Sequence, residues 1–215
     1  MVPRPCASLV ALSLIVPSLA IAQAPMGGDT PQAVIAGVQK AIAADDFVAV
    51  MPFIAPDARR ELVKEGVSGL LMVLAFSDPD DAMPGSKPLP KAELEKKRKA
   101  YKAAVKSADT VLSSYGITGV IGKPVLADAT QKPIEAALAK ADTVAMMRDL
   151  MAALDSIGPQ LGMKKSDAPK VPFKFGTVRD YKVNGNKATA KDEKETLDFV
   201  KIDGRWYLTP PTPPQ

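Results

Sequence analysis

The fold class is decided by residues 197–208, which read Leu-Asp-Phe-Val-Lys-Ile-Asp-Gly-Arg-Trp-Tyr-Leu. Apolar and polar residues alternate on both sides of Asp203-Gly204, a dipeptide typical of a two-residue turn between antiparallel strands. Directly opposite residues share a face of a sheet, so this stretch predicts a hairpin with one apolar face. The predicted pairs are Ile202–Arg205, Lys201–Trp206, Val200–Tyr207 and Phe199–Leu208.

A second hairpin signal, Val183-Asn184-Gly185-Asn186, precedes the first. We expect strands at 175–183, 187–191, 195–202 and 205–209, joined as a meander. In this second hairpin Tyr181 is expected opposite Ala188 and Arg179 opposite Ala190, with Asp180 on the other face. The faces then differ in character. The more apolar face carries Arg179, Tyr181, Leu197, Phe199, Lys201, Trp206 and Leu208, and the other carries Asp180, Asp198, Val200, Ile202, Arg205 and Tyr207.

Residues upstream of the strands have helical spacing. Thr30-Pro31 is a helix start, because threonine caps and proline suits the first helical position. Residues 67–76 are apolar on every side and predict a buried helix, with a core strand as the alternative. Further helices are expected at 31–42, 58–64 and 91–114, with a short helix or turn at 47–54. Residues 134–139 and 143–157 are expected to form one or two more, ended by Gly158-Pro159. The chain is therefore expected to be α+β, its helical N-terminal two-thirds packed on a C-terminal antiparallel meander of three to four strands.

The first 22 residues have the pattern of a signal peptide. Arg4 supplies the positive charge, residues 9–21 are mostly apolar, and Ala20-Ile21-Ala22 fits the cleavage rule. The alternative, a membrane anchor, needs about 20 apolar residues. We expect an exported, soluble protein, periplasmic or extracellular, with no integral membrane segment. The expected organisation is a signal peptide (1–22), a flexible lead-in (23–29), one α+β domain (30–209) with a long helical insertion (91–157), and a proline-rich tail (210–215).

Composition excludes several kinds of chemistry. The chain has no histidine, which rules out a Ser-His-Asp triad and a histidine-ligated metal. Its net charge of +4 is too small to imply nucleic acid. Three aspartates at 78–81 suggest calcium, but the loop position that needs glutamate is Leu89. We therefore expect no metal, no cofactor and no assigned catalytic residue. An exported chain whose one cysteine, Cys6, lies in the signal peptide, and which has no Asn-x-Ser/Thr site, fits a bacterial envelope.

Two sets of residues are candidate binding sites. The apolar sheet face includes two cations and no carboxylate, so a cavity above it suits a small apolar or anionic ligand. Its candidate ligand-binding residues are Arg179, Tyr181, Lys201 and Trp206. The alternative is that the cations extend past the core rim and Trp206 belongs to the core.

The second set lies on the helix that begins at Lys91. Residues 91–106 hold seven basic and two acidic side chains. The candidate contacts to an anionic envelope component are Lys96, Lys97, Lys99 and Lys102. The alternative is a solvated helix face, which two i,i+4 pairs, Glu93–Lys97 and Glu95–Lys99, would support.

Three segments resemble the NTF2-like (cystatin-like α+β) superfamily. They are the helix end with its acidic turn at 43–47, the hairpin at 184–190, and the closing strands at 197–208 with their hydrophobic-x-x-Gly-x-Trp pattern. The resemblance implies a cone-shaped pocket between helices and a curved sheet. Members that resemble ketosteroid isomerases use an aspartate base and a tyrosine donor. The corresponding candidates here are Asp180 or Asp198 with Tyr181 or Tyr207. The long helical stretch at 91–157 departs from a minimal member.

These observations favour an exported, soluble, non-catalytic binding or accessory protein of the bacterial cell envelope, holding a small ligand between helices and sheet. Two alternatives stay open. One is an NTF2-like enzyme of the isomerase or dehydratase type, and the other is an envelope interaction module that uses the basic helix at 91–106.

Overall fold

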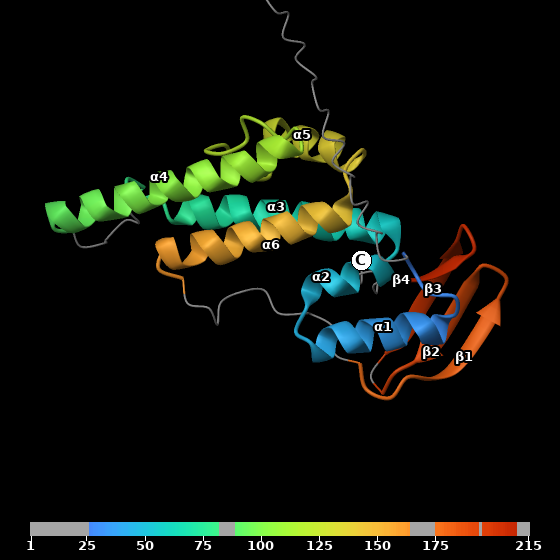
Figure 1. Ribbon diagram of the computed structural model, residues 1–215. Coiled ribbons are helices and arrows are strands. Elements are labelled where there is room, and N and C mark those ends of the chain that lie inside the picture. The colour runs from blue at the N-terminus through green and yellow to red at the C-terminus, as the bar shows by residue number, and fades with distance from the viewer. Residues whose placement is uncertain (1–25, 82–88, 164–174, 194, 210–215) are drawn as a thin grey trace, which may run out of the picture.

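The computed structural model describes residues 26–81, 89–163, 175–193 and 195–209 (Figure 1). The predicted signal peptide, the first residues of the lead-in and the proline-rich tail lie outside these residues. In the described part the chain is α+β, with helices first and one four-stranded antiparallel sheet at the C-terminal end, as predicted. The helices are α1 (Pro31–Ala43), α2 (Phe47–Val50), the 3-10 turn η1 (Met51–Phe53), α3 (Pro56–Phe76), α4 (Lys91–Ser114), α5 (Asp128–Leu138) and α6 (Thr143–Gln160).

Helix boundaries follow local chemistry in most places. The Thr30 hydroxyl accepts a hydrogen bond of 3.1 Å from the Ala33 amide and so caps α1. Helix α4 covers the predicted range. Three predictions are wrong. The helix predicted at 134–139 begins six residues earlier, because α5 begins at Asp128 and holds Pro133 in its interior. Helix α3 is continuous across Gly66 instead of forming two helices, and α6 continues through Pro159 to its last turn.

The prediction that residues 67–76 are buried on every side is also wrong. Leu70, Leu71 and Leu74 are buried, but Met72 is 46% exposed and Phe76 is 76% exposed. At 3.6 residues per turn, Met72 and Phe76 lie on the side of α3 opposite its buried stripe. An apolar run is therefore not sufficient here to predict complete burial.

The sheet has the order β1-β2-β3-β4, with strands β1 (Arg179–Asn184), β2 (Lys187–Lys191), β3 (Thr196–Ile202) and β4 (Arg205–Thr209). All four residue pairs predicted between β3 and β4 are confirmed. Asp203 and Gly204 have φ angles of 50° and 81°, the left-handed backbone that a two-residue hairpin turn of this type requires. The predicted apolar face is the buried one, because Leu197, Phe199 and Trp206 are buried on it.

The register predicted between β1 and β2 is wrong. Asn184 pairs with Lys187, so Gly185, at φ 58°, and not Asn184, is the first turn residue. The register then shifts between Arg179 and Lys182, where Asp180 has a φ of 57°. A bulge inserts one extra residue into a strand, so the strand residues beyond it point to the opposite face of the sheet from the one expected. Consequently Arg179 pairs with Lys191 and not with Ala190.

The second half of the predicted lead-in is held against the outer edge of β4. Gly28 and Trp206 exchange two backbone hydrogen bonds of 2.8 and 2.9 Å. The Arg205 guanidinium donates to the Met26 carbonyl at 3.1 Å and pairs with the Asp29 carboxylate. A Cβ on Gly27 would lie 2.7 Å from the Trp206 carbonyl oxygen, so only glycine fits there. This edge of the sheet is therefore covered by the chain itself.

The described residues form two hydrophobic clusters. In the first, α1 lies across the apolar face of the sheet, and in the second α3, α4, α5 and α6 form a bundle beside it (Figure 1). Leu62, near the start of α3, packs against both clusters and joins them. The sheet cluster contains Val34, Ile35, Val38, Ala41, Val50, Ile54, Ala188, Ala190, Leu197, Phe199, Trp206 and Leu208.

Two helix-interior glycines give a matched test of this packing. A Cβ on Gly37 of α1 would lie 2.1 Å from the Phe53 ring, whereas a Cβ on Gly69 of α3 meets nothing within 4 Å. Gly37→Ala should therefore lower the free energy of unfolding by about 1–3 kcal/mol through overpacking. Gly69→Ala should raise it by about 0.5–1 kcal/mol through helix propensity. Urea unfolding measures both, and equal stabilities of the two variants would contradict the described contact between η1 and α1.

Candidate functional site

Helix α1 fills the space above the predicted ligand-binding face. Trp206 is only 5% exposed and belongs to the same cluster as Val34, Ile35 and Val38 of α1. The side chains of α1 therefore occupy the position that a ligand would take directly above Trp206 and Phe199. This packing favours the core alternative for Trp206.

The structure brings Lys201 and Trp206 together. They face each other in the β3–β4 register, and the Lys201 ammonium nitrogen lies 5.7 Å from the centroid of the Trp206 ring. This is within the range of a cation–π interaction, worth about 0.5–1 kcal/mol at an exposed site. Lys201 is half-buried, so its alkyl stem crosses the rim of the sheet cluster while its charge contacts the indole.

Of the other two predicted ligand-binding residues, Tyr181 packs against the cluster that contains Trp206, whereas Arg179 lies off the apolar face. The Tyr181 ring is half-buried, with its centroid 6.4 Å from that of Phe199, and burial raises the pKa of Tyr181. Arg179 is exposed and pairs with Lys191, beyond the bulge at Asp180. The bulge thus separates Arg179 from the apolar face on which it was expected.

The aspartate and the tyrosine proposed for an isomerase-type site lie in different surroundings. The register places Asp198 and Tyr207 on one face, as predicted. Asp198 is exposed, but Tyr207 is buried, and its ring would lie 2.9 Å from a Cβ on Gly27. The chain at 26–29 therefore covers the tyrosine and leaves the aspartate in solvent.

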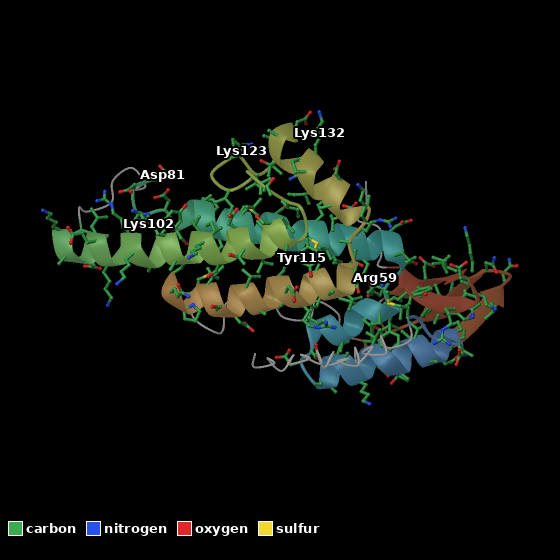
Figure 2. All side chains as sticks on the ribbon, turned by 45° about the horizontal axis from the view of Figure 1, so that its top comes forward. Arg59, Asp81, Lys102, Tyr115, Lys123 and Lys132 are labelled. Atoms are coloured by element: carbon green, nitrogen blue, oxygen red, sulfur yellow. The ribbon has the colours of Figure 1, made fainter. Side chains whose placement is uncertain are left out.

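Arg59 is a buried cation that the sequence reasoning missed. It lies near the start of α3, where the helix bundle meets the sheet (Figure 2), and is 3% exposed. One guanidinium nitrogen contacts the Met26 sulfur at 3.0 Å, and the Nε has no hydrogen-bond partner among the described residues. Burial lowers the pKa of Arg59, and the neighbouring Tyr207 and Asp142 oppose this shift. Its spacing could have revealed it, because positions 59, 63, 67, 70 and 74 form one helical stripe.

Replacing this arginine tests whether its charge stabilises the fold. A buried charge with an unsatisfied donor costs free energy, and an apolar side chain of similar length removes that cost. Arg59→Met should leave the free energy of unfolding unchanged or raise it by about 1 kcal/mol. The control is Arg60→Met, an exposed neighbour expected to change it by less than about 0.5 kcal/mol. A loss of stability in Arg59→Met alone would show that the charge stabilises the fold.

A groove of about 450 Å³ lies between α3 and α5. The Lys64 ammonium and the Glu135 carboxylate, 2.7 Å apart, are among its lining groups, and Leu138 adds a buried apolar surface. The remaining lining residues are Arg60, Glu61 and Ala139. The groove thus presents two basic and two acidic side chains, of which Lys64 and Glu135 pair with each other.

The predicted basic surface is exposed on a helix that extends beyond the bundle. The N-terminal part of α4 projects past the ends of α3 and α6 (Figure 1). All four predicted lysines are exposed, and none of them forms an ion pair with a described residue. The exposed lysines are Lys96, Lys97, Lys99 and Lys102. The predicted i,i+4 ion pairs Glu93–Lys97 and Glu95–Lys99 are not formed within 4 Å.

Acidic residues contact a different side of α4. The Arg98 Nε donates to the Asp80 carboxylate at 2.8 Å, and burial together with the neighbouring Asp78 raises the pKa of Tyr101. At 3.6 residues per turn Lys99 lies on the side opposite Ala108, which is buried against the bundle. Arg98 and Tyr101, which meet these acids, lie nearer the buried stripe than Lys99 does. Glu95 lies one turn before Lys99 on the outer side, so that side carries both charges, with lysines in excess. No group of three potential metal-binding side chains occurs among the described residues.

The C-terminal end of α4 is fixed to α6 by one polar contact. The Tyr115 hydroxyl donates to the Asp149 carboxylate at 2.6 Å, and burial and this hydrogen bond raise the pKa of Tyr115. The contact sets the position from which the basic half of the helix projects.

The raised pKa gives a signed pH dependence. Tyr115→Phe should lower the free energy of unfolding by about 0.5–1 kcal/mol at neutral pH. Above pH of about 10 the unfolded chain ionises this tyrosine while the folded chain keeps its proton, so the stabilisation is lost as pH rises. The difference between wild type and variant should therefore shrink between pH 9 and pH 11, measured by urea unfolding. A difference that stays constant would contradict the Tyr115–Asp149 contact.

Comparisons of this chain with protein-family models, curated proteins and solved structures found no match. The NTF2-like resemblance accordingly stays a prediction. None of the described helices is both long enough and apolar enough to cross a membrane.

Proposed function

We propose that this chain is an exported, non-catalytic accessory protein of the bacterial cell envelope that attaches to an anionic envelope component through α4. The observation that carries the proposal is the set of four exposed lysines without ion-pair partners among the described residues. A protein usually disperses or pairs such charges, because like charges three and four residues apart destabilise a helix. A surface that keeps them together is suited to an anionic partner.

The placement of these lysines supports the same proposal. Helix α4 is anchored by Ala104, Ala108 and Leu112, which are buried in its C-terminal half. Its N-terminal half contributes little to the core and extends away from the bundle (Figure 1). Lys96, Lys99 and Lys102 are three residues apart and share one side of α4, so a partner can approach these three together without disturbing the fold. The sheet site is less well supported, because α1 covers Trp206 and the bulge displaces Arg179.

Charge reversal on α4 tests the proposal. The variant Lys96/Lys97/Lys99→Glu should sediment with isolated cell envelopes at least about tenfold less than wild type, since each reversal replaces an attraction by a repulsion. The matched control is Lys123/Lys132/Lys140→Glu, which makes the same change of net charge around α5. Figure 2 shows Lys123 and Lys132 well away from Lys102 of α4. Equal loss in both triple variants would mean that net charge alone controls binding, and no loss in the α4 variant would refute the proposal.

A further inference from the structure

We propose that Met26 is a modification site, at which a peroxide oxidises the thioether to methionine sulfoxide and the new oxygen accepts a hydrogen bond from Arg59. Met26 begins the segment Met26–Asp29, which we call the strap and which lies along the outer edge of β4. Oxidation then tightens the strap on that edge. The inference goes beyond the proposed attachment through α4 and does not depend on it.

Met26 contacts two guanidinium groups with two different atoms. The Arg205 Nε donates to the Met26 carbonyl oxygen at 3.1 Å, and one terminal nitrogen of Arg59 lies 3.0 Å from the Met26 sulfur. A carbonyl oxygen is a good acceptor for a cation, whereas a thioether sulfur is a weak one. The strap therefore binds Arg205 well and Arg59 poorly.

Arg59 lacks oxygen acceptors at a position that water barely reaches. It lies near the start of α3 (Figure 2) and is 3% exposed. Its Nε has no hydrogen-bond partner among the described residues, and the terminal nitrogen that contacts Met26 meets sulfur. A buried cation with unsatisfied donors carries a free-energy cost that a hydrogen bond to an oxygen removes. An oxygen atom added to the Met26 sulfur supplies that acceptor.

The Met26 side chain is open to a small oxidant. It is partly exposed, whereas Met51, Met146 and Met147 are buried. A methionine side chain has three rotatable bonds, so the sulfur can move outward and admit an oxygen between itself and Arg59. Met72, which is 46% exposed, serves as the reference for a freely accessible methionine.

The oxidation balances with hydrogen peroxide as the only co-reactant. A sulfur lone pair attacks one peroxide oxygen, and the S–O bond forms as the O–O bond breaks. The proton of the transferred hydroxyl passes to the departing hydroxide, which leaves as water, so the sulfur is oxidised and the peroxide is reduced. Methionine oxidation usually disrupts packing. Here we expect the opposite sign, because the polar S–O group accepts a charge-assisted hydrogen bond from a buried donor.

Peroxide treatment of the folded chain tests the modification site. Mass spectrometry of peptides from chain treated with dilute hydrogen peroxide should find one added oxygen at Met26 and at Met72. The buried Met51, Met146 and Met147 should keep their thioethers. Oxidation of Met72 without oxidation of Met26 would refute the proposal.

Urea unfolding tests the contact between the added oxygen and Arg59. The matched control is Met26→Leu treated in the same way, because the effects of oxidising the other methionines then cancel. Relative to this control, treatment should lower the unfolding equilibrium constant of the wild type at least about tenfold, as expected for a hydrogen bond to a charged group. In an Arg59→Leu background, which lacks the donor, Met26 should give no such gain.

Met26→Gln tests the same contact without an oxidant. Its amide oxygen reaches about as far as the sulfoxide oxygen, so this variant should be more stable than Met26→Leu. A treated wild type no more stable than treated Met26→Leu, together with equal stabilities of Met26→Gln and Met26→Leu, would overturn the assignment of Arg59 as the donor.

Amide hydrogen exchange tests whether the strap tightens. The Gly28 amide donates to the Trp206 carbonyl at 2.9 Å, and the Lys201 amide, which donates to the Asn186 carbonyl at 2.8 Å, is the control between β2 and β3. Oxidation should slow exchange at Gly28 about tenfold more than at Lys201. Faster exchange at Gly28, or an equal change at both amides, would contradict tightening of the strap.

Discussion

Burial of one face of the β3–β4 hairpin beneath α1 is the interaction on which the remaining structure depends. Phe199, Trp206 and Leu208 contact the apolar stripe of α1, and this contact fixes the sheet relative to the N-terminal helices. It also occupies the one sheet face that is apolar enough to hold a small ligand. The proposed binding surface therefore lies on α4 and not on the sheet.

The hairpins show what the sequence can predict about such a sheet. Asp203-Gly204 allows one turn position, so every β3–β4 pair follows from the local sequence. Asn184-Gly185-Asn186 allows two neighbouring positions, and local chemistry does not choose between them. The bulge at Asp180 leaves no periodic signal, because it depends on a single backbone angle. The turn position moves the β1–β2 pairing by two residues and leaves each residue on its predicted face, so the bulge alone takes Arg179 off the apolar face.

In the helices too, some features follow from the local sequence and others depend on tertiary packing. The excess of lysines along residues 91–106 predicts the basic surface of α4, whereas its buried stripe, Ala104, Ala108 and Leu112, is known from the structure. The projection of that surface beyond the bundle depends on where α3 and α6 end, which is a tertiary property. The exposure of Phe76 is also a tertiary property. When a helix is apolar on every side, its sequence does not indicate which side will lack a neighbouring element.

Helix α4 therefore divides its length between stability and recognition. Its C-terminal half approaches the bundle through small alanines and is fixed by the Tyr115–Asp149 hydrogen bond. Its N-terminal half keeps repelling lysines together, at a cost that the anchored half offsets. Because screening at physiological salt limits their attraction to about 8 Å, these lysines act only on a partner already near α4.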